Sequence, residues 1–109
     1  MEKTNGEILF ADKFLDLIND SIKTTTVRSG VRNYVPGLYD MYNPDKTIHM
    51  YVNITGTEHK TFGELDDGVA KTDGFADAAE LKNELLSFYP DLTDDSPVTV
   101  VYLDRYCGE

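Results

Sequence analysis

Cysteine and histidine are almost absent from this chain of 109 residues. Cys107 is the single cysteine, so no disulfide can form within the chain, and a metal-binding or redox cysteine would lack a partner of its own kind. The two histidines, His49 and His59, lie ten positions apart, which is not a spacing typical of metal ligands. We therefore expect no disulfide, no metal and no other cofactor.

Long hydrophobic runs are also missing. No apolar run approaches the roughly 20 residues that a membrane-spanning helix requires, and residues 1–7 lack the apolar core of a secretion signal. Hydrophobic residues make up 40 % of the chain, which is ordinary for a globular domain and argues against disorder. The length is that of about one domain with one core. We expect a single domain over residues 1–109 that is soluble, cytoplasmic and monomeric.

Positive charge is scarce, with 10 lysines and arginines against 20 aspartates and glutamates. Indiscriminate binding to nucleic acid depends on cations that displace counterions, so a net charge of −10 argues against it. The imbalance is uneven, because residues 1–57 carry a net charge of −1 and residues 58–109 carry −9. An anionic ligand should approach through the first half, whereas the acidic second half leaves a basic partner protein as an open alternative.

One segment is basic. Residues 21–39 contain no aspartate or glutamate but hold three of the ten basic residues, Lys23, Arg28 and Arg32. The four β-branched residues that follow Lys23 predict a strand from Lys23 to Arg28. On a strand, Thr26 and Arg28 would point to one face and Lys23 to the other. A twist or bulge at the strand start would be needed to bring Lys23 and Thr26 together.

The remaining chain shows alternating strand and helix patterns. Period-two or short apolar runs predict strands over residues 7–10, 38–42, 47–55 and 97–103. Apolar residues at helical spacing predict helices over residues 12–20, 61–73 and 77–88, the first of them capped by Asp12. Residues 56–60 are expected to form a polar connection and residues 91–96 an acidic loop. The order β-α-β-β-β-α-α-β predicts an α+β domain with a mostly antiparallel sheet that can curl into a small barrel.

Three segments together resemble the ASCH family, which has a PUA-like fold and is associated with RNA. Residues 14–30 are similar to the family's first helix and its lysine–threonine–arginine strand. Residues 61–75 end, like the matching family segment, in an acidic residue, a glycine and an aromatic residue, and residues 80–103 resemble its last helix and strand. The resemblance implies a small mixed, mostly antiparallel β-barrel with about three flanking helices and a cleft that faces the basic strand.

The resemblance also implies an activity. Some small bacterial members are amidohydrolases that remove the acetyl group of N(4)-acetylcytidine, and they carry a lysine, a threonine three residues later and a glutamate in the acidic–glycine segment. Lys23 and Thr26 match the first two, but Asp73 stands where the glutamate would be. An aspartate is one methylene shorter, and displacement of a catalytic carboxylate by about 1 Å can cost on the order of a hundredfold in rate.

Acyl transfer needs a nucleophile, a base and an acid, and these residues are candidates for the three roles. A threonine hydroxyl such as that of Thr26 needs a base to take its proton. Lys23 can be that base if burial or a neighbouring positive charge, for which Arg28 is a candidate, lowers its pKa. Asp73 could then protonate the leaving amine. We also expect Arg28, Arg32 and Tyr34 to bind substrate, the tyrosine by stacking on a base.

Structural explanations compete with each of these roles. Lys23 could be a solvated lysine at a strand end, Thr26 a residue chosen for its β propensity, and Asp73 a turn residue before Gly74. Two functions of different class therefore stay open. One is a small amidohydrolase that acts on an acylated nucleoside, and the other is a non-catalytic module that binds a modified nucleoside or a short RNA.

Overall fold

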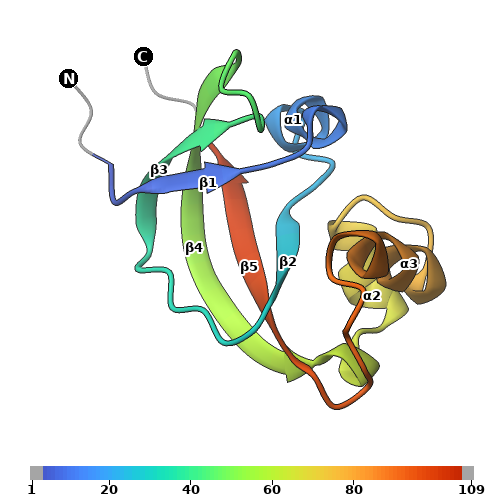
Figure 1. The fold of residues 1–109 in the computed structure, drawn as a ribbon. Helices are drawn as coiled ribbons and strands as arrows, with labels where there is room; N and C mark the ends of the chain where they lie inside the picture. The colour runs from blue at the N-terminus through green and yellow to red at the C-terminus, as the bar shows by residue number, and fades with distance from the viewer. Residues whose placement is uncertain (1–3, 107–109) are drawn as a thin grey trace.

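The computed structural model describes residues 4–106, which form a curled five-stranded sheet flanked by three α-helices (Figure 1). The strands are β1 (Glu7–Leu9), β2 (Thr25–Ser29), β3 (Gly37–Tyr42), β4 (His49–Thr61) and β5 (Pro97–Arg105). The helices are α1 (Asp12–Asn19), α2 (Asp67–Thr72) and α3 (Ala78–Phe88), with a 3₁₀ turn, η1 (Phe62–Glu64), after β4. The predicted order of elements and the α+β class are confirmed.

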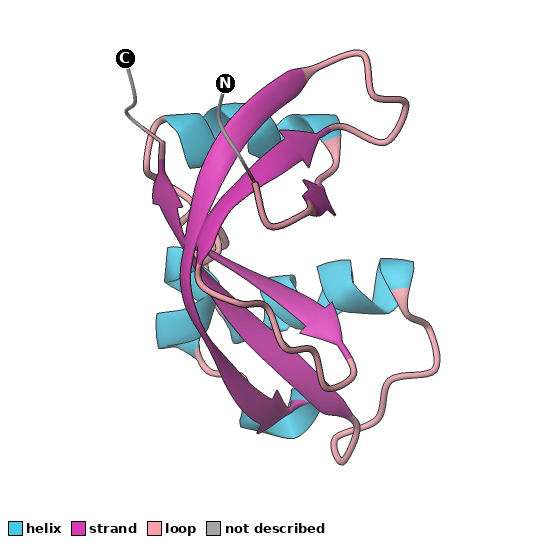
Figure 2. Ribbon diagram, turned by 90° about the vertical axis from the view of Figure 1, so that its left-hand side faces the viewer, coloured by secondary structure: helices cyan, strands magenta, loops and turns pink. Residues whose placement is uncertain are grey.

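The strand order is β1-β3-β4-β5-β2, so β1 and β2 are the two edges of the sheet. β1 pairs with β3 in parallel and the other pairs are antiparallel, which makes the sheet mixed. The sheet curls into a half-barrel (Figure 2). A hydrogen bond of 2.7 Å from Arg28 Nη2 on β2 to the carbonyl oxygen of Leu9 on β1 links the two edges.

β4 is longer than predicted, because the expected connection over residues 56–60 is part of the strand. The pairing with β5 shifts register between Ile54 and Gly56, which is a β-bulge. A bulge bends a strand without ending it, and a glycine inside a strand often marks one. The strand therefore continues to Thr61, which pairs with Pro97.

The helix predicted over residues 61–73 is divided into η1 and α2, because two capping residues follow each other closely. The backbone N–H of Thr61 donates to Glu64 Oε1 at 2.8 Å, and the side chain of Asp66 accepts from Val69 N at 3.0 Å. The cap predicted at Asp12 is also wrong. Ala11 precedes α1 and Asp12 is its first residue, with no side-chain capping bond.

Two hydrophobic clusters occupy the opposite faces of the sheet, and β5 contributes to both. Val98 and Val100 pack with α2 and α3, whereas Val101 and Leu103 pack with β1 and α1. This alternation follows from the period of two along a strand. The edge strand β2 contributes Val27 to the cluster under α2 and α3.

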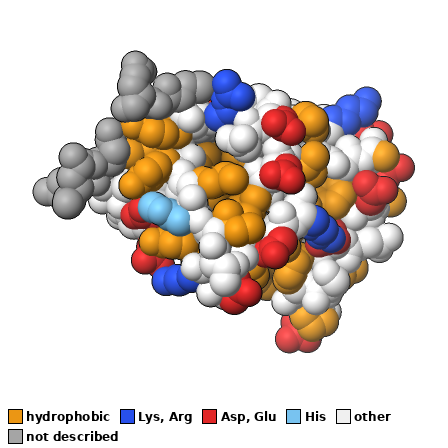
Figure 3. All heavy atoms as spheres, turned by 90° about the horizontal axis from the view of Figure 1, so that it is seen from above, with side chains coloured by type: hydrophobic (Ala, Val, Ile, Leu, Met, Phe, Trp, Pro, Cys, Tyr) orange, Lys and Arg blue, Asp and Glu red, His pale blue; other side chains and the backbone are white. Residues whose placement is uncertain are grey.

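The surface carries charges of both signs. On the face seen in Figure 3, acidic and basic side chains are interspersed among hydrophobic ones, and the acidic side chains are the more numerous. None of the helices within residues 4–106 is long and apolar enough to cross a membrane.

Candidate active site

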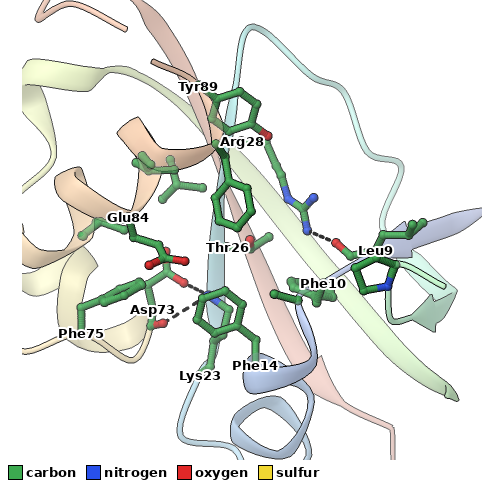
Figure 4. Close-up of a pocket in the computed structure, with 16 residues that line it drawn as sticks. Leu9, Phe10, Phe14, Lys23, Thr26, Arg28, Asp73, Phe75, Glu84 and Tyr89 are labelled. Carbon is green, nitrogen blue, oxygen red and sulfur yellow. Dashed lines mark hydrogen bonds and ion pairs between the residues drawn. The ribbon is translucent and has the colours of Figure 1, made fainter. Parts of the chain in front are cut away.

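A cavity of about 200 Å³ lies against the edge strand β2, between α1 and α3 (Figure 4). Its walls are mainly apolar, and the aromatic side chains among them are Phe10, Phe14, Phe75, Phe88 and Tyr89. Five polar or charged residues complete the lining, namely Lys23, Thr26, Arg28, Asp73 and Glu84. The cavity therefore combines flat apolar walls with a few convergent polar groups, as ligand sites commonly do.

Lys23 lies before β2 rather than on it. The strand predicted from residue 23 begins at Thr25, and the backbone N–H of Lys23 instead donates to Leu17 O at 3.0 Å, at the end of α1. The next residue, Thr24, donates its N–H to Thr72 O at 2.7 Å, at the end of α2. Strand alternation does not apply to Lys23 for this reason, so Lys23 and Thr26 both line the cavity without a bulge in β2.

Lys23 and Asp73 form a buried pair, with exposed fractions of 3 % and 2 %. Lys23 Nζ makes an ion pair with Asp73 Oδ1 and donates a hydrogen bond of 3.2 Å to the backbone oxygen of Asp73. Nζ also lies 4.7 Å from the ring centroid of Phe14 and 6.0 Å from that of Phe75. Asp73 thus holds the lysine through two oxygens while two aromatic rings exclude water from it.

Burial lowers the pKa of Lys23 from 10.5 to about 7, and the positive charge of Arg28 adds to this effect. The charge of Glu84 acts in the opposite direction. The carboxylate of Asp73, which contacts Nζ, also favours the ammonium form. The lowered pKa brings the neutral amine, which is the form that can accept a proton, closer to neutral pH.

Thr26 and Arg28 are alternate residues of β2 and share one face of the strand. Thr26 is 6 % exposed. The guanidinium of Arg28 lies 4.8 Å from the ring centroid of Phe10, and its Nε is buried with no hydrogen-bond partner within residues 4–106. Burial lowers the pKa of Arg28, but a guanidinium stays protonated at neutral pH. Arg28 thus supplies a positive charge and an unused N–H at the cavity.

Arg32 and Tyr34, which we expected to bind substrate, do not line this cavity. Arg32 is exposed, and its Nε donates to Ser29 O at 2.9 Å. Tyr34 is half-buried and packs edge-on against Tyr39, with ring centroids 5.9 Å apart. Both residues lie in the loop between β2 and β3, and a substrate-binding role for them stays a prediction.

Glu84 is the cavity residue that the sequence analysis missed. Its side chain is 21 % exposed, and its Oε2 forms an ion pair of 2.9 Å with Lys13 Nζ. A signal was present in the sequence, because Glu84 lies three residues after Leu81 and four before Phe88. A carboxylate at that spacing interrupts the apolar face of a helix.

Within residues 4–106, no group of three or more histidine, cysteine, aspartate or glutamate side chains is placed to hold a metal ion. Cys107, for which we predicted neither a disulfide nor a metal, lies outside the described residues.

Solved structures with the same arrangement of elements identify the fold. The ASCH domain of Lactobacillus crispatus JV V101 superimposes with a TM-score of 0.74 over 91 % of this chain and 77 % of its own, at 15 % sequence identity. The chain has the ASCH, PUA-like fold. A protein of Enterococcus faecalis V583 assigned to DUF984 also superimposes on this chain, with a TM-score of 0.72, at 12 % identity, over 97 % of this chain and 78 % of its own.

The hypothetical protein PH0355 also superimposes on this chain, with a TM-score of 0.72 and 16 % identity over 93 % of this chain and 98 % of its own. No protein-family model matches the sequence, and no curated protein matches it. At these identities the likeness concerns the fold alone. The function of this ASCH-fold protein has to be argued from its own cavity.

Proposed function

We propose that this protein is an amidohydrolase that removes an acyl group from a modified nucleoside such as N(4)-acetylcytidine. The proposal depends mainly on the burial and the lowered pKa of Lys23. It is a buried lysine with a pKa of about 7, on the wall of an aromatic cavity that also contains Thr26. A lysine of this kind can act as a general base near neutral pH, because proton transfer is most effective when the pKa of the base lies near the working pH.

The reaction follows from these groups. The amine of Lys23 takes the proton of the Thr26 hydroxyl as Thr26 Oγ attacks the acyl carbon. The C–N bond then breaks, and the leaving nitrogen takes the proton from the Lys23 ammonium. The acyl group is now an ester of Thr26, and water hydrolyses it with Lys23 again as the base, which frees the acid and restores the hydroxyl. Arg28 Nε–H is available to stabilise the negative charge on the acyl oxygen.

We assign Asp73 a positioning role in this reaction rather than the acid role. Both its Oδ1 and its backbone oxygen contact Lys23 Nζ, and the residue is 2 % exposed. Because Oδ1 is already paired with the Lys23 ammonium, the carboxylate serves to hold the lysine. The contact from the backbone oxygen depends little on side-chain length, so an aspartate can hold the lysine at this position.

The walls of the cavity favour a flat, uncharged ligand. Phe14, Phe75 and Tyr89 line the cavity and are only partly buried, so they present aromatic surface against which a base can pack. The net charge of −10 opposes a polyphosphate chain, and the face seen in Figure 3 carries no concentrated basic patch. A free nucleoside therefore fits this site better than a long RNA.

The direct test is hydrolysis of N(4)-acetylcytidine by the purified protein, followed by chromatography of cytidine. Lys23→Met should abolish turnover because it removes the base while it keeps an apolar side chain of similar length. Lys71→Met is the matched control, since Lys71 is an exposed lysine in the last turn of α2. We expect the control to keep the rate of the natural protein.

Absence of turnover by the folded natural protein would contradict the amidohydrolase. The alternative is then a non-catalytic module for a modified nucleoside or a short RNA. Titration of binding against salt separates these two ligands, because binding to an RNA backbone weakens steeply with salt and binding of a neutral nucleoside does not.

A further inference from the structure

The cavity contains two carboxylates that differ in their surroundings. Asp73 is enclosed, and its side chain is taken up by Lys23. Glu84 reaches from α3 toward Lys23 and Asp73, and its side chain is 21 % exposed (Figure 4). Of the two, Glu84 is therefore the carboxylate that a ligand in the cavity can contact.

The other contact of Glu84 does not explain its position. Its Oε2 pairs with Nζ of Lys13, whose side chain is 59 % exposed, and a surface ion pair of this kind usually contributes little to stability. The pair leaves Oε1 available for a second contact. Leu81 and Leu85 on the same helix are buried, so Glu84 places a carboxylate on the face of α3 that borders the cavity.

Glu84 and Arg28 lie on opposite sides of Thr26 (Figure 4). The carboxylate is an acceptor and the guanidinium a donor. A ligand held between the aromatic walls thus meets an acceptor on one side of the attacking hydroxyl and a donor on the other. An N-acylated amino group on a heteroaromatic ring has the matching groups, an N–H and an oxygen on either side of the scissile bond.

We propose that Glu84 recognises the substrate. Its carboxylate accepts a hydrogen bond from the N–H of the amide that is hydrolysed. The substrate class is then a secondary amide of a heteroaromatic amine, as opposed to an ester or an amide whose nitrogen is alkylated. This inference rests on the proposed amidohydrolase function. Glu84 acts as a hydrogen-bond acceptor here and not as an acid, because the leaving nitrogen receives its proton from Lys23.

The test compares two substrates in two variants. N(4)-Acetylcytidine has the amide N–H, and N(4)-acetyl-N(4)-methylcytidine lacks it. Glu84→Leu removes the acceptor and continues the apolar face of α3, and Lys13→Met removes only the outer partner of Glu84. A hydrogen bond to a charged group corresponds to about tenfold to a hundredfold in affinity.

We expect Glu84→Leu to raise KM for N(4)-acetylcytidine by about that factor and to leave KM for the methylated substrate unchanged. Lys13→Met should change neither value by more than about twofold, since the ion pair is at the surface. An equal loss with both substrates, or the same loss in Lys13→Met, would overturn the proposal. If Glu84→Leu fails to fold, Glu84→Gln keeps the shape, removes the charge and should give a smaller loss in the same direction.

A measurement of nucleoside binding tests the role of Glu84 independently of whether the protein is an amidohydrolase. Isothermal titration calorimetry with N(4)-acetylcytidine reports the role of Glu84 even if the natural protein does not hydrolyse the nucleoside. If Glu84→Leu binds N(4)-acetylcytidine more weakly than the natural protein and Lys13→Met does not, Glu84 recognises the nucleoside even without turnover. Equal binding by the natural protein and Glu84→Leu, or no binding by either, contradicts it.

Discussion

Lys23 Nζ contacts Asp73 twice, once at the carboxylate and once at the backbone oxygen, although the two residues lie 50 positions apart. The contact joins the segment before β2 to the C-terminus of α2. Asp73 caps that helix, and Gly74 follows with a φ of +93°, a conformation that favours glycine. The chain turn at Gly74 therefore helps to fix where Asp73 meets the lysine.

The pH dependence of the reaction should follow Lys23. In the proposed reaction the neutral amine is the active form, so kcat/KM should rise with pH through about 7 and then level off. Asp73, Arg28 and Glu84 are the charged groups around it, and Asp73→Asn removes one of the two carboxylates that favour the ammonium. That variant should move the rise to lower pH. A pH–rate profile that is flat between pH 5.5 and 8.5, roughly one and a half units on either side of that pKa, would contradict Lys23 as the base.

The Lys23–Asp73 pair should show strong coupling in stability. Below pH 7, where Lys23 is the ammonium, Lys23→Met leaves a buried carboxylate without its cation and should lower the free energy of unfolding by about 3–5 kcal/mol. The double variant Lys23→Met/Asp73→Leu removes both charges and should recover most of that loss. Urea unfolding of the natural protein, both single variants and the double variant measures the coupling. Additive effects would show that the two side chains do not depend on each other.

Two substitutions of Thr26 distinguish the role of its hydroxyl from the role of its side-chain shape. Thr26→Val keeps the β-branched side chain in β2 and should abolish turnover with little change in folding, whereas Thr26→Ser should keep measurable activity. Mass spectrometry of the protein during turnover should detect one added acyl group, which Thr26→Val cannot form. Full activity of Thr26→Val would instead indicate direct attack by water.

Arg28 connects the two edges of the sheet as well as lining the cavity. Arg28→Met removes the hydrogen bond to Leu9 O and should lower the free energy of unfolding by about 1–3 kcal/mol and raise KM. Arg32→Met is the matched control, because Arg32 is exposed and lies outside the cavity, and its effect on stability should stay within about 0.5 kcal/mol. A raised KM in Arg32→Met would restore the substrate-binding role that the sequence predicts for it.

Local patterns in the sequence determined the order of the elements. The β-branched run after Lys23 forms β2, the spacing of Leu81 and Leu85 forms one face of α3, and Asp77 caps that helix. These features depend on neighbours within a few residues, which is the range that propensity and periodicity describe. The resemblance to the ASCH family likewise depended on short motifs and predicted the fold that the structure has.

Other features were decided by partners far along the chain. The strand β4 continues past Gly56 because β5 pairs with it, and no pattern within residues 56–60 indicates that pairing. Glu84 lines the cavity only because the fold packs α3 beside it. The role proposed for Glu84 depends on the residues across the cavity from it, and the helical periodicity of the sequence does not show which residues those are.

The sequence by itself determined which chemical groups are present, a lysine, a threonine and an acidic residue in a recognisable order. Only the tertiary structure decided how deeply these groups are buried and in which direction their pKa values shift. Lys23 has a lowered pKa because α1, α2 and two aromatic rings remove water from it, and desolvation depends on the packing of segments that are distant in sequence. The same lysine at an exposed strand end would be an ordinary cation.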